Sequence, residues 1–65
     1  MTNRQVIKAQ DVQVGDVIAI DQYASLEVAT IHQFKTQDGT PSFTYYDKRG
    51  AHVWNRKGAE MFKLN

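Results

Sequence analysis

The chain has 65 residues, enough for one small hydrophobic core and too few for two, so we expect a single domain over residues 1–65. It contains no cysteine, which excludes disulfide bonds, thiolate metal sites and a cysteine nucleophile. The formal net charge of +1 favours neither an acidic nor a basic partner. Its distribution is uneven, because residues 31–65 carry six Lys or Arg against three Asp or Glu, whereas residues 1–30 carry two against four.

Membrane and export signals are not expected either. No apolar run approaches the ~20 residues that a membrane-spanning helix requires. The first five residues are polar or charged after the start Met and lead directly into alternating residues, unlike the apolar core of a secretion signal. We therefore expect a cytoplasmic protein with no membrane partner.

The first half of the chain predicts strands. Residues 5–8 form a short extended entry, and residues 16–21 are a β-branched run bounded by acids, which is typical of a strand. The longest candidate covers residues 26–34. Its apolar alternation changes phase between Val28 and Ala29, which predicts a bulge or a sharp bend. Such a bend would carry one long strand from the first sheet of a small barrel into the second.

The connection over residues 8–16 is longer than a hairpin loop. We expect Val12 and Val14 to be buried in it, and Gly15 to adopt a left-handed conformation.

Tight turns dominate the second half. Asp38-Gly39 suits the positive φ angles of a hairpin, and Pro41 fits only the start or edge of a strand. The remaining predicted elements are strands at residues 43–46, 51–54 and 61–64, turns at 48–50 and 55–58, and one helical turn at Ala59-Glu60.

Five short strands favour closure, because closing a barrel removes exposed sheet edges. We therefore predict an all-β fold, a small five-stranded SH3-like barrel with one short helical turn before the last strand. Residues 11–18, Asp-Val-Gln-Val-Gly-Asp-Val-Ile, resemble the entry of many SH3-like barrels, including KOW-type, Tudor-like and translation-factor N-terminal domains. This resemblance implies a fold and leaves the function open.

Catalysis is not expected. His32 and His52 lie on predicted strands, with Ser25 and Ser42 near strand starts, and their spacing shows no nucleophile paired with a base. A domain of this size also leaves little volume for a pocket that excludes water. The two histidines without cysteines form no recognisable ligand set. We therefore predict a protein that is not an enzyme and has no cofactor and no metal.

A cluster of aromatic and basic residues is the best candidate site. Alternation on adjacent strands places Tyr46, His52 and Trp54 on one exposed face, while Phe43, Tyr45, Ala51 and Val53 point to the core. Burial of Trp54 in the core is the alternative. The predicted binding residues are Tyr46, Lys48, Arg49, His52, Trp54, Arg56 and Lys57.

The expected function is that of a non-enzymatic binding module. Tyr, Trp and Arg dominate protein interfaces, so a protein partner is the first hypothesis. Aromatic rings also stack on bases while cations neutralise phosphates, so nucleic acid is the second. The nucleic-acid hypothesis requires the four cations of the predicted turns to converge on one face with Tyr46 and Trp54, away from Asp16, Asp21 and Asp47. These cations are Lys48, Arg49, Arg56 and Lys57. The sequence does not specify the oligomeric state.

Overall fold

A computed structural model describes residues 5–65 of the chain. The polar N-terminal residues from which the absence of a secretion signal was predicted lie mostly outside this range. The described residues are all-β apart from one short 3-10 turn. No helix among them is long and apolar enough to cross a membrane. The elements, in chain order, are β1 (Gln5–Lys8), η1 (Ala9–Asp11), β2 (Val17–Ala19), β3 (Ser25–Glu27), β4 (Thr30–Lys35), β5 (Pro41–Tyr46), β6 (His52–Arg56) and β7 (Glu60–Lys63).

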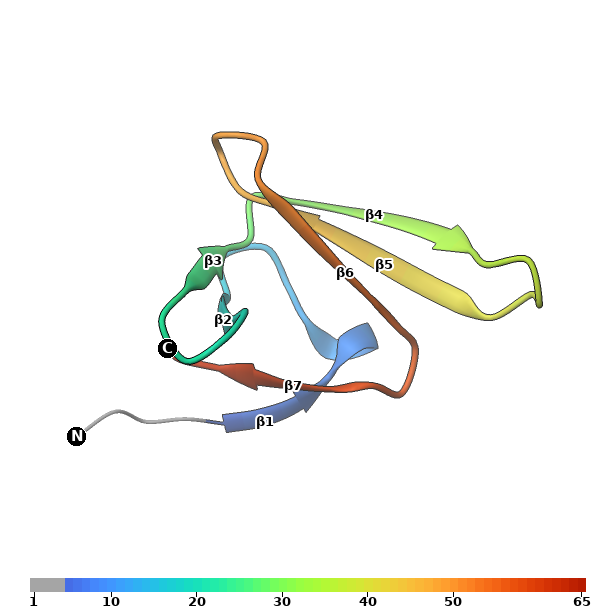
Figure 1. The fold of residues 1–65 in the computed structure, drawn as a ribbon, viewed down its shortest axis with the longest axis horizontal. Coiled ribbons are helices and arrows are strands. Elements are labelled where there is room, and N and C mark those ends of the chain that lie inside the picture. The colour runs from blue at the N-terminus through green and yellow to red at the C-terminus, as the bar shows by residue number, and fades with distance from the viewer. Residues whose placement is uncertain (1–4) are drawn as a thin grey trace.

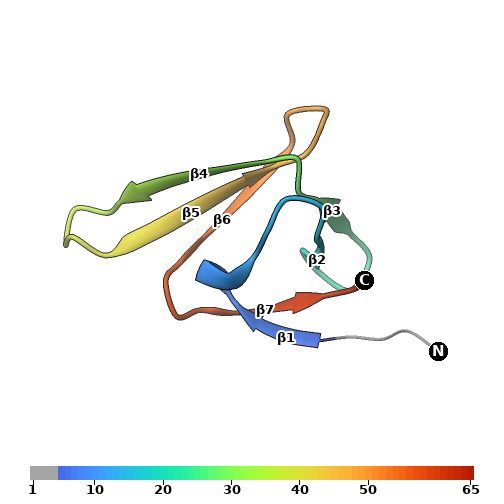
Figure 2. The same ribbon diagram turned by 180° about the vertical axis from the view of Figure 1, so that it is seen from behind.

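The strands form two antiparallel sheets, one with the order β1-β7-β2-β3 and the other with the order β4-β5-β6. Figures 1 and 2 show the chain passing between the sheets from β3 to β4 and again from β6 to β7. Within residues 5–65 no strand pairing joins the two sheets, so the predicted closed barrel is not observed. At the β6–β7 connection the chain turns, and the Ala59 carbonyl accepts a hydrogen bond from the Ala9 N–H of η1 at 2.9 Å.

The predicted bend between Val28 and Ala29 is confirmed. The Ala29 N–H donates to the Tyr46 carbonyl at 2.7 Å, although the strand register pairs Tyr46 with Thr30. Two successive residues therefore face one residue of β5, the arrangement of a β-bulge. On one side of it Leu26 and Val28 are buried in the core, and on the other the chain continues as β4. The bulge is thus what transfers the strand between sheets.

The core lies between the two sheets and η1. Tyr45 is its largest fully buried side chain, and its hydroxyl donates to the Ala9 carbonyl at 2.6 Å, which joins β5 to η1. Burial raises the pKa of Tyr45 to about 12 because the phenolate would be poorly solvated there. The buried apolar residues are Ala9, Val12, Ile18, Leu26, Val28, Tyr45 and Met61.

The two valines of the first connection have different environments. Val12 is buried as predicted, but the prediction for Val14 was wrong, since it is 64% exposed. The Asp16 N–H donates to the Gln13 carbonyl and closes a turn with Val14 at its tip. Gly15 has the predicted positive φ of 98°, and its N–H reaches the Val28 carbonyl at 2.8 Å.

Other boundaries differ from the prediction. The helical turn expected at Ala59-Glu60 is absent, because Ala59 closes a turn to Arg56 and Glu60 already begins β7. The helical turn lies instead at η1, after the first strand. The prediction that Ala51 points to the core was wrong, since it is exposed and precedes β6, with its N–H bonded to the Asp47 carboxylate in the β5–β6 turn. Pro41 begins β5, as predicted.

Candidate functional site

The candidate site is the outward face of the β4-β5-β6 sheet. Facing pairs Tyr45–Val53 and Ile31–Tyr45 lie on the core side, so alternate residues point away from the core. We call these alternate positions the outward face. They are Thr30, His32, Phe34, Ser42, Thr44, Tyr46, His52, Trp54 and Arg56. None of them is acidic.

Trp54 is the main apolar feature of the outward face. It is 51% exposed, so the sequence-based alternative of a core tryptophan was wrong. Its indole meets the ring of Phe34 edge-on, with ring centroids 5.9 Å apart and planes inclined at 63°. Phe34 faces Ser42 and Trp54 faces Thr44, so the two rings meet across β5, where the Ser42 side chain is fully buried. A half-exposed indole is therefore held in place by packing from one side.

Tyr46 and His52 form a second ring pair on the same face. They face each other in the register, with centroids 5.5 Å apart and planes inclined at 39°. The prediction that Tyr46, His52 and Trp54 share a face is confirmed by this register.

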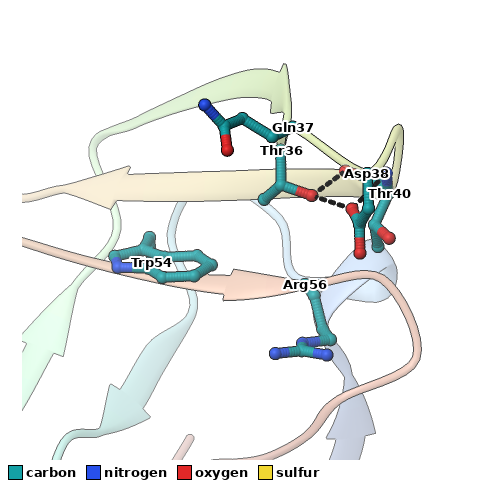
Figure 3. Close-up of a pocket in the computed structure, with 6 residues that line it drawn as sticks. All are labelled: Thr36, Gln37, Asp38, Thr40, Trp54 and Arg56. Atoms are coloured by element: carbon teal, nitrogen blue, oxygen red, sulfur yellow. Dashed lines mark hydrogen bonds between the residues drawn. The ribbon is translucent and has the colours of Figure 1, made fainter.

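A hollow of about 400 Å³ adjoins Trp54 at the end of the sheet. Figure 3 shows Trp54 and Arg56 along β6 and the β4–β5 hairpin beside them, with the Thr36 hydroxyl bonded to Asp38. The lining residues are Thr36, Gln37, Asp38, Thr40, Trp54 and Arg56. The hollow is thus lined by one tryptophan, one arginine, one aspartate, one glutamine and two threonines.

Asp38 organises the hairpin that borders this hollow. Its carboxylate accepts hydrogen bonds from the Thr36 hydroxyl and, at 3.1 Å, from the Thr40 N–H. These bonds favour the ionised form and lower the pKa of Asp38 to about 2. Gly39 follows with a φ of 84°, the left-handed conformation expected from the Asp-Gly signal. Asp38 therefore remains charged at neutral pH and fixes one wall of the hollow.

The predicted cations do not converge. Lys48 and Arg49 lie in the β5–β6 turn, whereas Arg56 and Lys57 lie at the other end of β6. Five strand residues separate these ends by roughly 17 Å. None of the four has a carboxylate within 4.0 Å, since both ion pairs recorded among residues 5–65 involve cations of the other sheet.

Acidic residues accompany each pair of cations. A second hollow, of about 340 Å³, is lined by Ser25, Glu27, Asp47, Lys48 and Arg49. The Asp47 carboxylate accepts bonds from the backbone N–H groups of Arg49 and Ala51, at 2.8 and 2.9 Å. Asp38 borders the hollow next to Arg56. The nucleic-acid hypothesis requires the four cations to lie on one face away from Asp47, and this arrangement is not observed.

The sequence reasoning missed Phe34 and His32. His32 was considered only as a catalytic or metal-binding residue, and Phe34 is the last residue of the strand predicted over residues 26–34. The phase change at the bulge could have identified them from the sequence. Side chains alternate along a strand, and Ile31 points inward, so His32 and Phe34 lie on the opposite face.

No model of a protein family matches the chain, and no curated protein or solved structure is significantly similar to it. Among residues 5–65, no three His, Asp or Glu side chains lie close enough together to share a metal ion.

Proposed function

We propose that this protein is a non-enzymatic binding module that recognises a protein partner through the outward face. The observation that carries the proposal is the half-exposed Trp54, supported by Phe34 and adjoining a hollow that Arg56 also lines. Trp, Tyr and Arg are the residue types that most often dominate protein interfaces, particularly beside a pocket. An aromatic side chain already fixed by its neighbours also loses little entropy on binding.

We further propose that the fold is an open form of the SH3-like barrel. If β3 and β4 are taken as one strand bent at the bulge, five strands remain after β1: β2, β3–β4, β5, β6 and β7. The bent strand contributes to both sheets, as predicted for a small barrel. The fold supports a binding role only indirectly, since small barrels carry many functions.

The test is partner capture followed by mapping. This protein would be immobilised, and proteins that it captures from an extract of the source cell would be purified. Each would then be titrated into a ¹⁵N-labelled sample of this protein, and the amide shifts recorded by NMR. We expect the largest amide shifts at Phe34, Tyr46, His52, Trp54 and Arg56. Shifts confined to the β1-β7-β2-β3 sheet would contradict the proposal, because that sheet does not contribute to the outward face.

Nucleic acid remains the second candidate, on one observation: the nine outward positions hold aromatic, hydroxyl and basic side chains and no carboxylate. A single strand running along β6 would find bases to stack on Trp54 and cations at both ends. The acids beside both pairs of cations oppose this.

Fluorescent single- and double-stranded oligonucleotides at low and physiological salt separate the two candidates. For a protein-binding module we expect weak binding at low salt that disappears at physiological salt, because only scattered cations contribute. Tight binding that survives at physiological salt and is lost in the double variant Lys48→Glu, Arg49→Glu would instead establish the nucleic-acid function.

A further inference from the structure

The free edge of β4 is the longest unpaired strand edge among the described residues. The edge strands of the two sheets are β1 and β3 in one and β4 and β6 in the other. β4 has six residues, more than any of the other three, and β6 in addition contacts η1. Figures 1 and 2 show no element except β5 running beside β4. Such an edge presents a row of N–H and C=O groups to a further strand.

The hydrogen-bond pattern shows which residues of β4 present these groups. The Thr36 N–H donates to the Thr40 carbonyl at 3.0 Å, in line with the β4–β5 register. Bonded residues alternate along an antiparallel ladder, so Thr30, His32 and Phe34 bond to β5. The main chain of Ile31, Gln33 and Lys35 therefore points away from β5.

The other side of β5 shows the complementary hydrogen-bond pattern. There the Asp47 N–H donates to the Ala51 carbonyl, and the Lys57 N–H to the Pro41 carbonyl. Odd-numbered residues of β5 thus bond to β6, which leaves the even-numbered ones for β4, as required.

We propose that two copies of this chain associate by antiparallel pairing of β4 with β4, about a two-fold axis at Gln33. In this register Gln33 faces its own counterpart, and Ile31 faces Lys35 of the second copy. In each of these pairs the backbone groups of both residues are free, so the pair exchanges two N–H···O=C bonds, while His32 and Phe34 form the non-hydrogen-bonded pairs between them. The two three-stranded sheets join into one six-stranded sheet. Because the contact is two-fold symmetric, both β4 edges are used in the dimer and no third copy is able to add through β4.

The side chains are compatible with this register. Lys35 is the one Lys or Arg on β4, and it lies opposite Ile31 of the second copy, along which its aliphatic stem packs. The amides of the two Gln33 residues face each other and are able to hydrogen-bond. On the outward side His32 lies beside Phe34 of the second copy. No two residues of like charge face each other in this register, an arrangement that would destabilise the strand pair.

The symmetric registers one residue away, centred on His32 or on Phe34, are poorer because each forms two pairs of free residues within β4, against three for the register centred on Gln33. The register centred on His32 would oppose His32 to His32 and pair Ile31 with Gln33, leaving Lys35 without a facing residue that has free backbone groups. The positions of the free groups therefore favour the register centred on Gln33. The dimer would present two outward faces on one sheet surface, and two linked sites raise the avidity for a repeated partner.

Single-cysteine variants test the register directly, because the chain has no other cysteine. Facing residues of a hydrogen-bonded antiparallel pair have Cα atoms ~5.5 Å apart, within the range that a disulfide bridges. We expect Gln33→Cys to form a covalent dimer rapidly on mild oxidation. The matched control is Gln37→Cys in the exposed hairpin, whose two copies would lie roughly 25 Å apart along the strands and should cross-link only slowly. Equal rates for the two variants would overturn the proposal.

Sedimentation equilibrium tests it without cross-linking. We expect the wild-type chain to show a mass that rises with concentration toward twice that of the single chain. Gln33→Pro should remain monomeric, since proline removes an N–H that points off the edge and not one bonded to β5. Gln33→Lys should do the same by opposing two charges at the axis. Gln33→Ala keeps the N–H and should still dimerise.

Folding of each variant is checked by thermal melting. A single-chain mass for the wild type up to millimolar concentration would refute the dimer. Dimers that persist in folded Gln33→Pro and Gln33→Lys would place the contact elsewhere. Because Gln33 is not on the outward face, these results are independent of whether the outward face binds a protein partner.

Discussion

Tyr45→Ala is expected to leave the domain unfolded at 25 °C. Truncating a large buried aromatic side chain costs about 3–5 kcal/mol. A domain of this size has only a few kcal/mol of net stability. Tyr45 is also fully buried and joins β5 to η1 through its hydroxyl, so the variant loses both core volume and the contact between the second sheet and the N-terminal segment. Circular dichroism and urea titration provide the measurement.

Tyr45→Phe separates the hydroxyl from the ring. The Ala9 carbonyl would keep only the long bond from the Val12 N–H at 3.4 Å, and we expect a loss of about 1–2 kcal/mol with the fold intact. The same variant changes the alkaline response. The pKa of Tyr45 is about 12 in the folded state, against 10.0 for an ordinary tyrosine, so its contribution to stability is complete below pH 10 and is lost as the pH rises toward 12.

The wild-type chain should therefore lose stability more steeply than Tyr45→Phe between pH 10 and 12. Tyr23→Phe is the matched control, because Tyr23 is 90% exposed and lies in the loop between β2 and β3. Its unfolding curve should follow the wild type at every pH.

A folded Tyr45→Ala variant with near wild-type stability would contradict the assignment of Tyr45 to the centre of the core.

Trp54→Ala is expected to abolish partner binding while the domain stays folded. Truncating a central interface residue of this type costs 2 kcal/mol or more, which corresponds to at least a roughly 30-fold rise in Kd. Its effect on stability should be about 1 kcal/mol, since half of the side chain is already in water and the main loss is the contact with Phe34. Calorimetric titration with the captured partner and thermal unfolding measure the two effects separately.

Tyr23→Ala is the matched control for Trp54→Ala, because it removes an exposed aromatic side chain outside the outward face. Its Kd should equal that of the wild type. If Trp54→Ala unfolded the domain, the tryptophan would be a structural residue and its binding role would be withdrawn. If binding survived in the folded variant, the partner would have to contact another surface.

The bulge shows what local pattern is able to predict. The change of phase after Val28 is readable because side chains alternate between the two faces of a strand, so a shift in the apolar pattern requires an extra residue. The Asp38-Gly39 turn, Pro41 at the start of β5 and the inward position of Tyr45 follow from equally local rules. The prediction that Val14 is buried was wrong, because an apolar residue at the tip of a turn cannot be distinguished in the sequence from a buried one.

The sequence by itself therefore determined the strand-forming segments, the tight turns, and the face shared by Tyr46, His52 and Trp54, because these depend on alternation and on the conformations open to Gly and Pro. Only the tertiary structure decided which rings meet, how far the cations are from one another, and that the sheets stay separate within residues 5–65. Those features depend on the register between distant segments and on the packing of η1 against the core. The spacing of residues in the sequence does not predict this register or this packing, because both depend on contacts between residues far apart in the chain.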